Sequence, residues 1–166
     1  LGTILDAIDA VVGPRLGLDA QLSNWAWDGQ RATYLDVTTP LLNTPDGATR
    51  LDLRLLTAPM PAAVRPLVRR AVAPGIVAAY HRPRDVVLDL LGNLLKDDLT
   101  DAVEVGLALA ATRVRPALTR AEVDTFYAAN SRLWEVLLRL RLADRWWQRR
   151  VRRRDYPFLL PGPIAR

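Results

Sequence analysis

The stretch Asp19–Asp36, DAQLSNWAWDGQRATYLD, decides how the first part of this chain folds. Within it, two short apolar runs, Trp25–Trp27 and Ala32–Leu35, flank an Asp-Gly pair. Asp-Gly between two strand-like runs is a strong local signal for a tight turn. We therefore expect a β-hairpin. Its two tryptophans alternate with an alanine and should face one side, where we expect them to pack in the core rather than stack on nucleobases.

The hairpin would place three oxygen-bearing side chains at its two ends, namely Asp19, Asn24 and Asp36. Phosphoryl transfer to an alcohol needs such a set: one carboxylate to accept the hydroxyl proton, and an amide and a carboxylate to hold Mg²⁺. The alternative is an ordinary surface hairpin whose carboxylates are solvated.

An Asp, an Asn five residues on and a hairpin ending in a second Asp resemble the catalytic loop and metal-binding strand of the protein-kinase-like fold. The stretch is most similar to the aminoglycoside phosphotransferase and choline kinase branch. This resemblance implies that Asp19 is the catalytic residue, that Asn24 and Asp36 hold Mg²⁺, and that ATP is the phosphate donor. The chain departs from the pattern at Gly17, where the family usually has His, and at Val37, which follows the second Asp.

The resemblance covers only the C-terminal lobe of that fold. Nothing in the sequence precedes Leu1, no Gly-rich phosphate loop is visible, and the single lysine, Lys96, lies far past the hairpin. We therefore expect a kinase-like C-terminal lobe without the nucleotide-binding N-terminal lobe. Such a lobe would be part of a longer protein and inactive by itself.

Apolar residues recur with a helical period along most of the chain. A helix opened by Pro83 should bury one face, formed by Val87, Leu90, Leu91, Leu94 and Leu95. Thr119 with Glu122 forms a capping box for the longest helix. The apolar stripe of that helix includes Val123, Phe126, Tyr127, Trp134, Leu137 and Leu138. Around the hairpin the sequence therefore predicts a mainly α fold with one N-terminal β-hairpin and four principal helices, near residues 1–12, 83–95, 101–112 and 119–149.

The segment between the hairpin and residue 83 is less regular. Leu51–Leu56 alternates weakly, which is typical of a short strand or an extended segment. A helix should follow Pro61 and run through Val72, where Pro74-Gly75 breaks it, and a short helical piece should then run to Tyr80. His81, the only histidine, is expected to be structural. Asp85 and Asp89 share a helix face, and we expect both carboxylates to be solvated rather than to approach a substrate.

The length of 166 residues suits one domain, 1–166, and half of the residues are hydrophobic, so a core can form. The absence of cysteine excludes disulfides, thiolate metal sites and a cysteine nucleophile. No apolar run is long enough for a transmembrane helix, and no signal-peptide pattern precedes the first helix. These features fit a cytoplasmic protein.

The end of the chain, residues 149–166, is an arginine-rich helix end followed by a tail rich in Pro and Gly. Five of the six residues from Arg149 to Arg154 are arginines, in a chain whose net charge is +5. We favour a solvated helix end, which the helix dipole also suits. The neighbouring Trp146 and Trp147 keep a nucleic-acid-binding surface as an alternative.

Three functions follow from these patterns. The first is a fragment of an ATP-dependent phosphotransferase that acts on a small-molecule hydroxyl. The second is a non-catalytic kinase-like or helical module that binds a protein, which the substitution at Gly17 favours. The third is a basic nucleic-acid-binding domain, although no helix-turn-helix or zinc-ligand spacing supports it.

Overall fold

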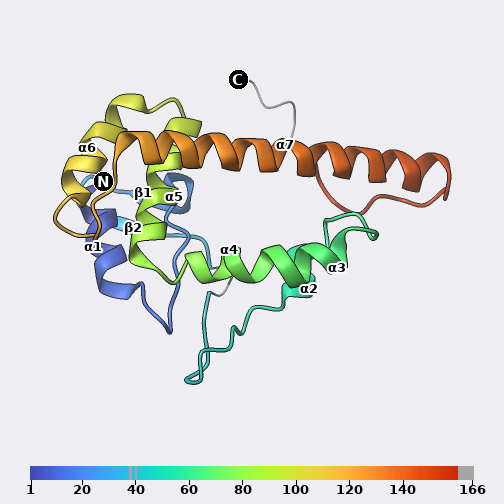
Figure 1. Cartoon of the computed structure of the whole chain (residues 1–166), viewed down its shortest axis with the longest axis horizontal. Helices are drawn as coiled ribbons and strands as arrows, with labels where there is room; N and C mark the ends of the chain where they lie inside the picture. Colours follow the sequence, from blue (N-terminus) through green and yellow to red (C-terminus); the bar gives the residue numbers. More distant parts are fainter. Residues whose placement is uncertain (38, 40, 161–166) are drawn as a thin grey trace. The chain divides into compact units, whose positions relative to one another are not determined.

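A computed structural model shows a mainly helical fold with one two-stranded antiparallel sheet near the N-terminus, as the hydrophobic periods predict (Figure 1). The structure describes residues 1–37, 39 and 41–160. Its elements, in chain order, are α1 (Gly2–Val11), the 3₁₀ turn η1 (Leu22–Asn24), β1 (Trp25–Trp27), β2 (Ala32–Tyr34), α2 (Leu53–Thr57), α3 (Arg65–Leu67), the π-helical turn η2 (Val68–Val72), α4 (Ala73–Ala79), α5 (Pro83–Lys96), α6 (Thr100–Ala110) and α7 (Arg120–Arg150).

The chain divides into two compact units. Unit 1 comprises Leu1–Asp52 and Gly75–Ala129, and unit 2 comprises Leu53–Pro74 and Asn130–Arg166. Helix α7 therefore begins in unit 1 and ends in unit 2. Of the tail expected at 149–166, residues 161–166 lie outside the described residues.

Unit 1 is built around a hydrophobic core in which α5 packs against α1 and α6. The predicted face of α5 is confirmed for Val87, Leu90, Leu91 and Leu94, which are fully buried, whereas Leu95 is only partly buried against the core. Burial of one such leucine contributes about 2 kcal/mol to folding. Gly106 of α6 lets the two helices approach closely, since a Cβ there would lie 2.4 Å from Leu91 Cδ2.

The hairpin has the predicted pairing, with Trp25 opposite Tyr34 and Trp27 opposite Ala32. Its turn is closed by Asp28, whose Oδ1 accepts the backbone N–H groups of residues 30 and 31 at 2.8 and 2.7 Å. The rings of Trp25 and Tyr34 meet edge to face, 5.2 Å apart, and pack on the core. Core packing is thus right for Trp25 but wrong for Trp27, which is 60% exposed at the end of the hairpin away from the core.

The segment that leads to α5 corrects two predictions. Leu53–Thr57 is a short helix rather than an extended segment. The following helix does not end at Pro74, because η2 runs directly into α4, which contains that proline. Proline lacks an N–H and its ring crowds the carbonyl four residues earlier. The wider π-helical turn just before it is a known way to accommodate such an interruption.

Helix α7 is the predicted long helix. The Glu122 N–H contacts Thr119 Oγ1 at 3.3 Å, which confirms half of the capping box, and the helix runs through Arg150. Val123 is the one residue of α7 that is buried, and Trp134 of the predicted apolar stripe is 53% exposed. Among the described helices, none combines the length and apolar composition that crossing a bilayer requires.

Candidate functional site

The loop that carries Asp19 is fixed from two sides in unit 1. The Gly17 N–H donates to the Leu41 carbonyl at 2.7 Å, and the Leu18 N–H donates to the Tyr80 carbonyl at 3.1 Å. A Cβ at position 17 would lie 2.9 Å from that Tyr80 oxygen. Glycine is therefore required here by the close approach of another backbone segment.

His81 occupies the space beside Gly17. Its Nδ1 lies 3.0 Å from the Gly13 carbonyl oxygen, and its Nε2 is 3.1 Å from the position that a Cβ on Gly17 would take. Within the described residues, this Nε2 is buried without a hydrogen-bond partner. An imidazole from a distant segment therefore lies beside Gly17. No local sequence pattern predicts this contact, because the two residues are far apart along the chain.

Asp19 and Asn24, two of the three predicted site residues, are brought together. The side-chain amide of Asn24 donates a hydrogen bond from Nδ2 to the backbone carbonyl oxygen of Asp19, at 3.0 Å. The Leu35 N–H donates to the Asn24 carbonyl at 2.8 Å, so the ladder continues one pair beyond the strands. Asp36 is therefore the next residue after the ladder partner of Asn24, at the same end of the hairpin.

The Asp19 carboxylate is held by its neighbour Gln21, whose Nε2 donates to both oxygens at 3.0 and 3.1 Å. The Gln21 side-chain oxygen in turn accepts a hydrogen bond from Lys96 Nζ at 3.3 Å, and the same ammonium donates to Asn93 Oδ1 at 3.0 Å. The only lysine of the chain is thus connected to the candidate catalytic loop through Gln21. The sequence alone did not indicate this role of Gln21.

A concentration of negative charge surrounds this loop. Burial raises the pKa of the Tyr34 phenol to about 12, and the charges of Asp19 and Asp36 add to the rise. Burial and the same carboxylates also raise the pKa of Tyr80. Because both phenols respond to both carboxylates, Asp19 and Asp36 act on one small region of unit 1.

Asp89 of α5 belongs to the same region. Desolvation first, and repulsion by Asp19 second, raise its pKa to about 6, against the opposing effects of Lys96 and Asn93. Its Oδ2 is buried without a hydrogen-bond partner among the described residues. The expectation of a solvated carboxylate is therefore wrong for Asp89, whereas Asp85 pairs with Arg82 near the surface. The spacing of residues 89, 93 and 96 on one helix face was the available signal.

Asn24 and Asp36 are the two residues of this region that the sequence predicts to hold a divalent metal ion. Among the described residues, no group of three or more His, Cys, Asp or Glu side chains is placed to hold a metal ion. One carboxylate and one amide oxygen, from Asp36 and Asn24, are a set that Mg²⁺ accepts, since it usually keeps water and substrate phosphates as its other ligands.

Comparison with known proteins places the chain in a family. The model of one protein family, described as a family of unknown function (DUF6206), matches residues 1–145. The chain belongs to the DUF6206 family. No curated protein and no solved structure matches it. The matched range of DUF6206 includes Asp19, Asn24, Asp36 and Asp89, and it ends before Trp146.

Proposed function

We propose that unit 1 is the C-terminal lobe of a protein-kinase-like phosphotransferase that moves a phosphoryl group from ATP to a small-molecule hydroxyl. The observation that carries the proposal is the closure of the loop onto the hairpin, through the bond from Asn24 Nδ2 to the Asp19 carbonyl. This bond supports the proposal together with the ladder that ends at Leu35, because Asp19, Asn24 and Asp36 then belong to the same end of the hairpin. The nucleotide-binding half would be supplied by another segment or subunit.

Each residue would have a separate role. Asp19 accepts the proton of the acceptor hydroxyl as its oxygen bonds to the γ-phosphorus and the bond from that phosphorus to the ADP oxygen breaks. Asn24 Oδ1 and the Asp36 carboxylate would hold Mg²⁺, which neutralises charge on the phosphates when bound. Gln21 and Lys96 orient the Asp19 carboxylate, because they hold it through two side-chain contacts in series.

Asp89 is the second carboxyl group of this region and the alternative proton acceptor. Its Oδ2 is buried, and desolvation raises its pKa to about 6. A buried carboxyl oxygen is less accessible to an acceptor hydroxyl, which favours Asp19 for this role.

Manganese broadening of tryptophan indole signals tests the metal site in solution. Mn²⁺ bound between Asn24 and Asp36 should broaden the indole signal of Trp25 before that of Trp27, which lies about 7 Å further along the strand. Asp36→Asn should remove this ordered broadening. Asp28→Asn, at the turn of the same hairpin, is the control, because the amide keeps an oxygen that can accept the turn hydrogen bonds.

The outcomes decide the proposal. The proposal is supported if the Trp25 signal broadens before the Trp27 signal, and if this difference is lost in Asp36→Asn and kept in Asp28→Asn. Uniform weak broadening of all indoles, or ordered broadening that survives in Asp36→Asn, would refute the metal site and with it the phosphotransferase assignment.

A further inference from the structure

Unit 2 leaves large apolar side chains in solvent. Its described residues bury Thr57, Ala73 and Tyr156, and no other residue among them is buried. An exposed apolar surface of this extent marks a site of interaction in a soluble protein. The exposed large hydrophobic residues of unit 2 are Leu55, Leu56, Leu67, Val72, Leu133, Trp134, Val136, Leu140, Leu142, Trp146, Trp147, Val151 and Leu159.

Part of this surface has a regular spacing on α7. Leu133, Val136, Leu140, Ala143 and Trp147 follow one another at intervals of three and four residues, and all five are exposed. This spacing keeps a narrow apolar line on one side of a helix, as at the interface of paired helices. We call these five residues the α7 seam.

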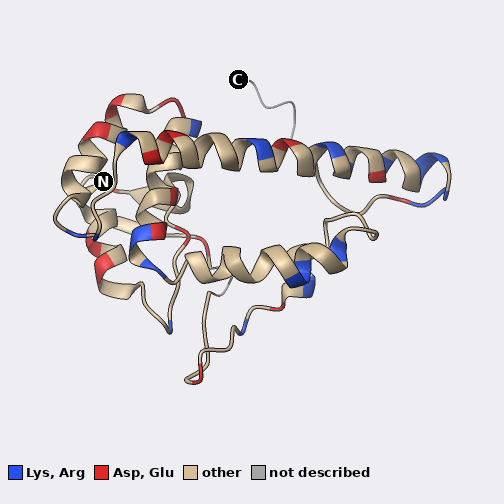
Figure 2. Ribbon diagram, viewed as in Figure 1, with Lys and Arg blue, Asp and Glu red and all other residues tan. Residues whose placement is uncertain are grey.

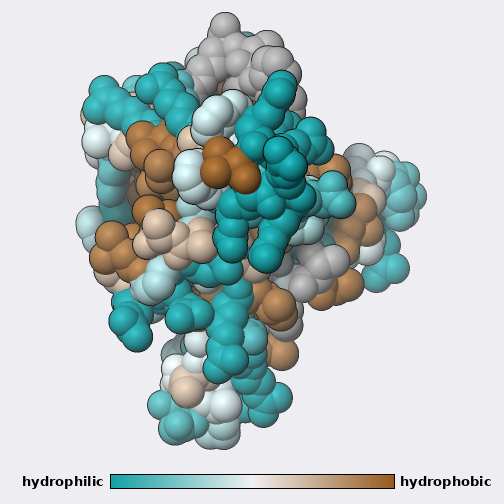
Figure 3. Space-filling view, turned by 90° about the vertical axis from the view of Figure 1, so that its right-hand side faces the viewer, coloured by the Kyte–Doolittle hydropathy of each residue, from teal (hydrophilic) through white to brown (hydrophobic). Residues whose placement is uncertain are grey.

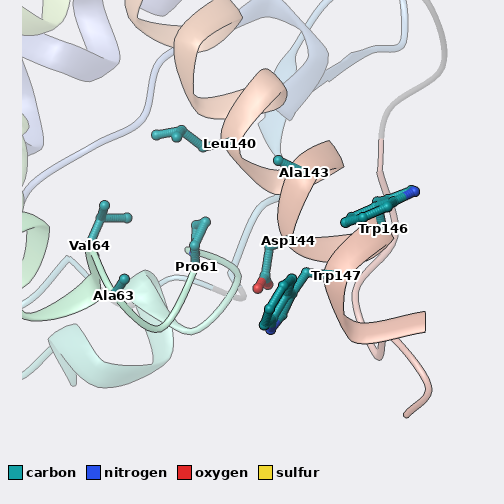
Figure 4. Close-up of a pocket in the computed structure, with 8 residues that line it drawn as sticks. All are labelled: Pro61, Ala63, Val64, Leu140, Ala143, Asp144, Trp146 and Trp147. Atoms are coloured by element: carbon teal, nitrogen blue, oxygen red, sulfur yellow. The ribbon is translucent and has the colours of Figure 1, made fainter. Parts of the chain in front are cut away.

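A shallow pocket lies along the seam within unit 2. Leu140, Ala143 and Trp147 line one side of it, and Pro61 and Val64 line the other, around a volume of about 410 Å³. Figure 4 shows Asp144 and Trp147 turned toward Pro61, whereas Trp146 points away from that proline. Three of the five seam residues therefore form one wall of a shallow apolar pocket, whereas Leu133 and Val136 lie outside it.

The surroundings of the seam are strongly basic. Between residues 130 and 155 there are nine arginines and three acidic residues, and residues 53–74 add four arginines and no acid. The charges of α7 are mostly positive beyond residue 130 (Figure 2). Figure 3 shows hydrophobic patches that directly border hydrophilic ones on the side where α7 ends. A complementary partner must therefore be both apolar and acidic.

We infer that the α7 seam docks an amphipathic helix of a partner protein that has acidic residues beside its apolar stripe. Three observations select this occupant. The seam has helix-pairing periodicity, the pocket is concave, and the rim is cationic. A second copy of unit 2 would bring like charges together, which disfavours self-pairing through this face.

Two other anionic partners fit less well. An anionic bilayer favours an apolar face that is bordered by basic groups alone, whereas Asp144 lines the pocket beside the seam. The arginines would attract nucleic acid, but nucleic acid binds through its phosphates and by stacking of its bases on aromatic rings, so exposed leucines and valines would not contribute. The inference rests on unit 2 alone and is independent of the phosphotransferase proposed for unit 1.

Fluorescence anisotropy with a synthetic helix tests the inference on the full chain. The labelled probe, about 20 residues long so that it can form a helix, carries Leu at alternating three- and four-residue spacing and Glu beside the stripe. A scrambled peptide of the same composition is the control for charge alone. Two variants form a matched pair, since Leu140 and Leu142 are 37% and 40% exposed and lie about 200° apart around the helix.

We expect saturable binding of the patterned helix, at least about tenfold weaker in Leu140→Ser and changed less than about twofold in Leu142→Ser. Equal binding of the scrambled peptide, equal loss in the two variants, or no saturable binding would overturn the inference. Vesicles containing phosphatidylserine and a single-stranded oligonucleotide complete the test. If the vesicles or the oligonucleotide bind in a way that depends on Leu140, and the peptide does not bind, the seam belongs to that ligand and the inference of a partner helix is refuted.

Discussion

Units 1 and 2 differ in how they use apolar side chains. The hydrophobic core cluster lies entirely in unit 1, where α1, α5 and α6 bury it together with the start of α7. Unit 2 contains more exposed than buried large apolar residues among those described. Burial of apolar surface is the main favourable term in folding. Unit 1 is thus stabilised by its own hydrophobic core, whereas most of the large apolar side chains of unit 2 are exposed to solvent.

The two units also differ in charge. Unit 1 contains fifteen acidic and nine basic residues, whereas the described part of unit 2 contains three acidic residues and thirteen arginines. A cluster of carboxylates suits a site that is proposed to hold a cation. A cationic apolar face suits an acidic partner. The two proposed kinds of recognition would therefore belong to different units.

The largest expected effect contrasts one leucine from each unit. Leu90→Ala should lower the free energy of unfolding by about 3 kcal/mol, because it leaves a cavity in a fully buried position. Leu140→Ala, on the exposed seam, should change it by less than about 0.5 kcal/mol. Urea denaturation of both variants measures the difference. Equal losses would mean that the seam is packed in the folded protein and that the contrast is wrong.

The buried carboxyl group of Asp89 should make the stability of unit 1 depend on pH, and the substitution Asp89→Asn should remove this dependence. Because the folded state raises the pKa of this carboxyl from 3.8 to about 6, the folded protein holds the proton more firmly, and stability falls as pH rises from about 4 to about 6. Asp89→Asn should therefore raise the free energy of unfolding by on the order of 2–3 kcal/mol at pH 7.5 and little at pH 4.

Urea midpoints at several pH values measure this change. Asp97→Asn, at the exposed end of the same helix, is the control and should show no such trend. A gain in Asp89→Asn that is the same at pH 4 and pH 7.5 would show that burial of the charge is not its cause.

A pair of helical glycines tests how tightly the core of unit 1 is packed. Gly106→Ala should destabilise by about 1–3 kcal/mol, since its Cβ would overlap the side chain of Leu91, which is fully buried and must shift. Gly75→Ala meets nothing within 4 Å and should stabilise by about 0.5–1 kcal/mol through helix propensity. Thermal unfolding of both variants gives the sign. A stabilised Gly106→Ala would show that α5 and α6 are not in close contact.

The smallest expected effect concerns the arginines after α7. Arg152, Arg153 and Arg154 are all exposed and carry charges of one sign, so changing them together to Gln should leave the melting temperature nearly unchanged. Differential scanning calorimetry measures this. A large drop in melting temperature would reveal that these side chains are paired with acids in the folded protein.

Patterns within one element were readable from the sequence, and contacts between elements were not. The Asp-Gly turn predicted the hairpin and its pairing, and the period of α5 predicted its buried face, because both depend on neighbours a few residues apart. The place of His81 beside Gly17 and the link from Lys96 to Gln21 depend on tertiary packing. No local pattern encodes them.

The exposed face of α7 was mispredicted for a related reason. Amphipathic periodicity shows that a helix has an apolar side, but not whether that side lies in a core or on a surface. The same limit explains Trp27, whose alternation with Ala26 predicted a common face with Trp25 but not how far the core extends beneath it. Both errors concern the edge of a core rather than the type of element.

Anomalous diffraction from crystals soaked in Mn²⁺ tests the central claim most directly. The account predicts a peak about 2.2 Å from an Asp36 carboxylate oxygen and from Asn24 Oδ1, with the Asp19 carboxylate near it but outside its coordination shell. It would be contradicted by side chains of Asn24 and Asp36 that point to opposite faces of the hairpin, with no peak between them.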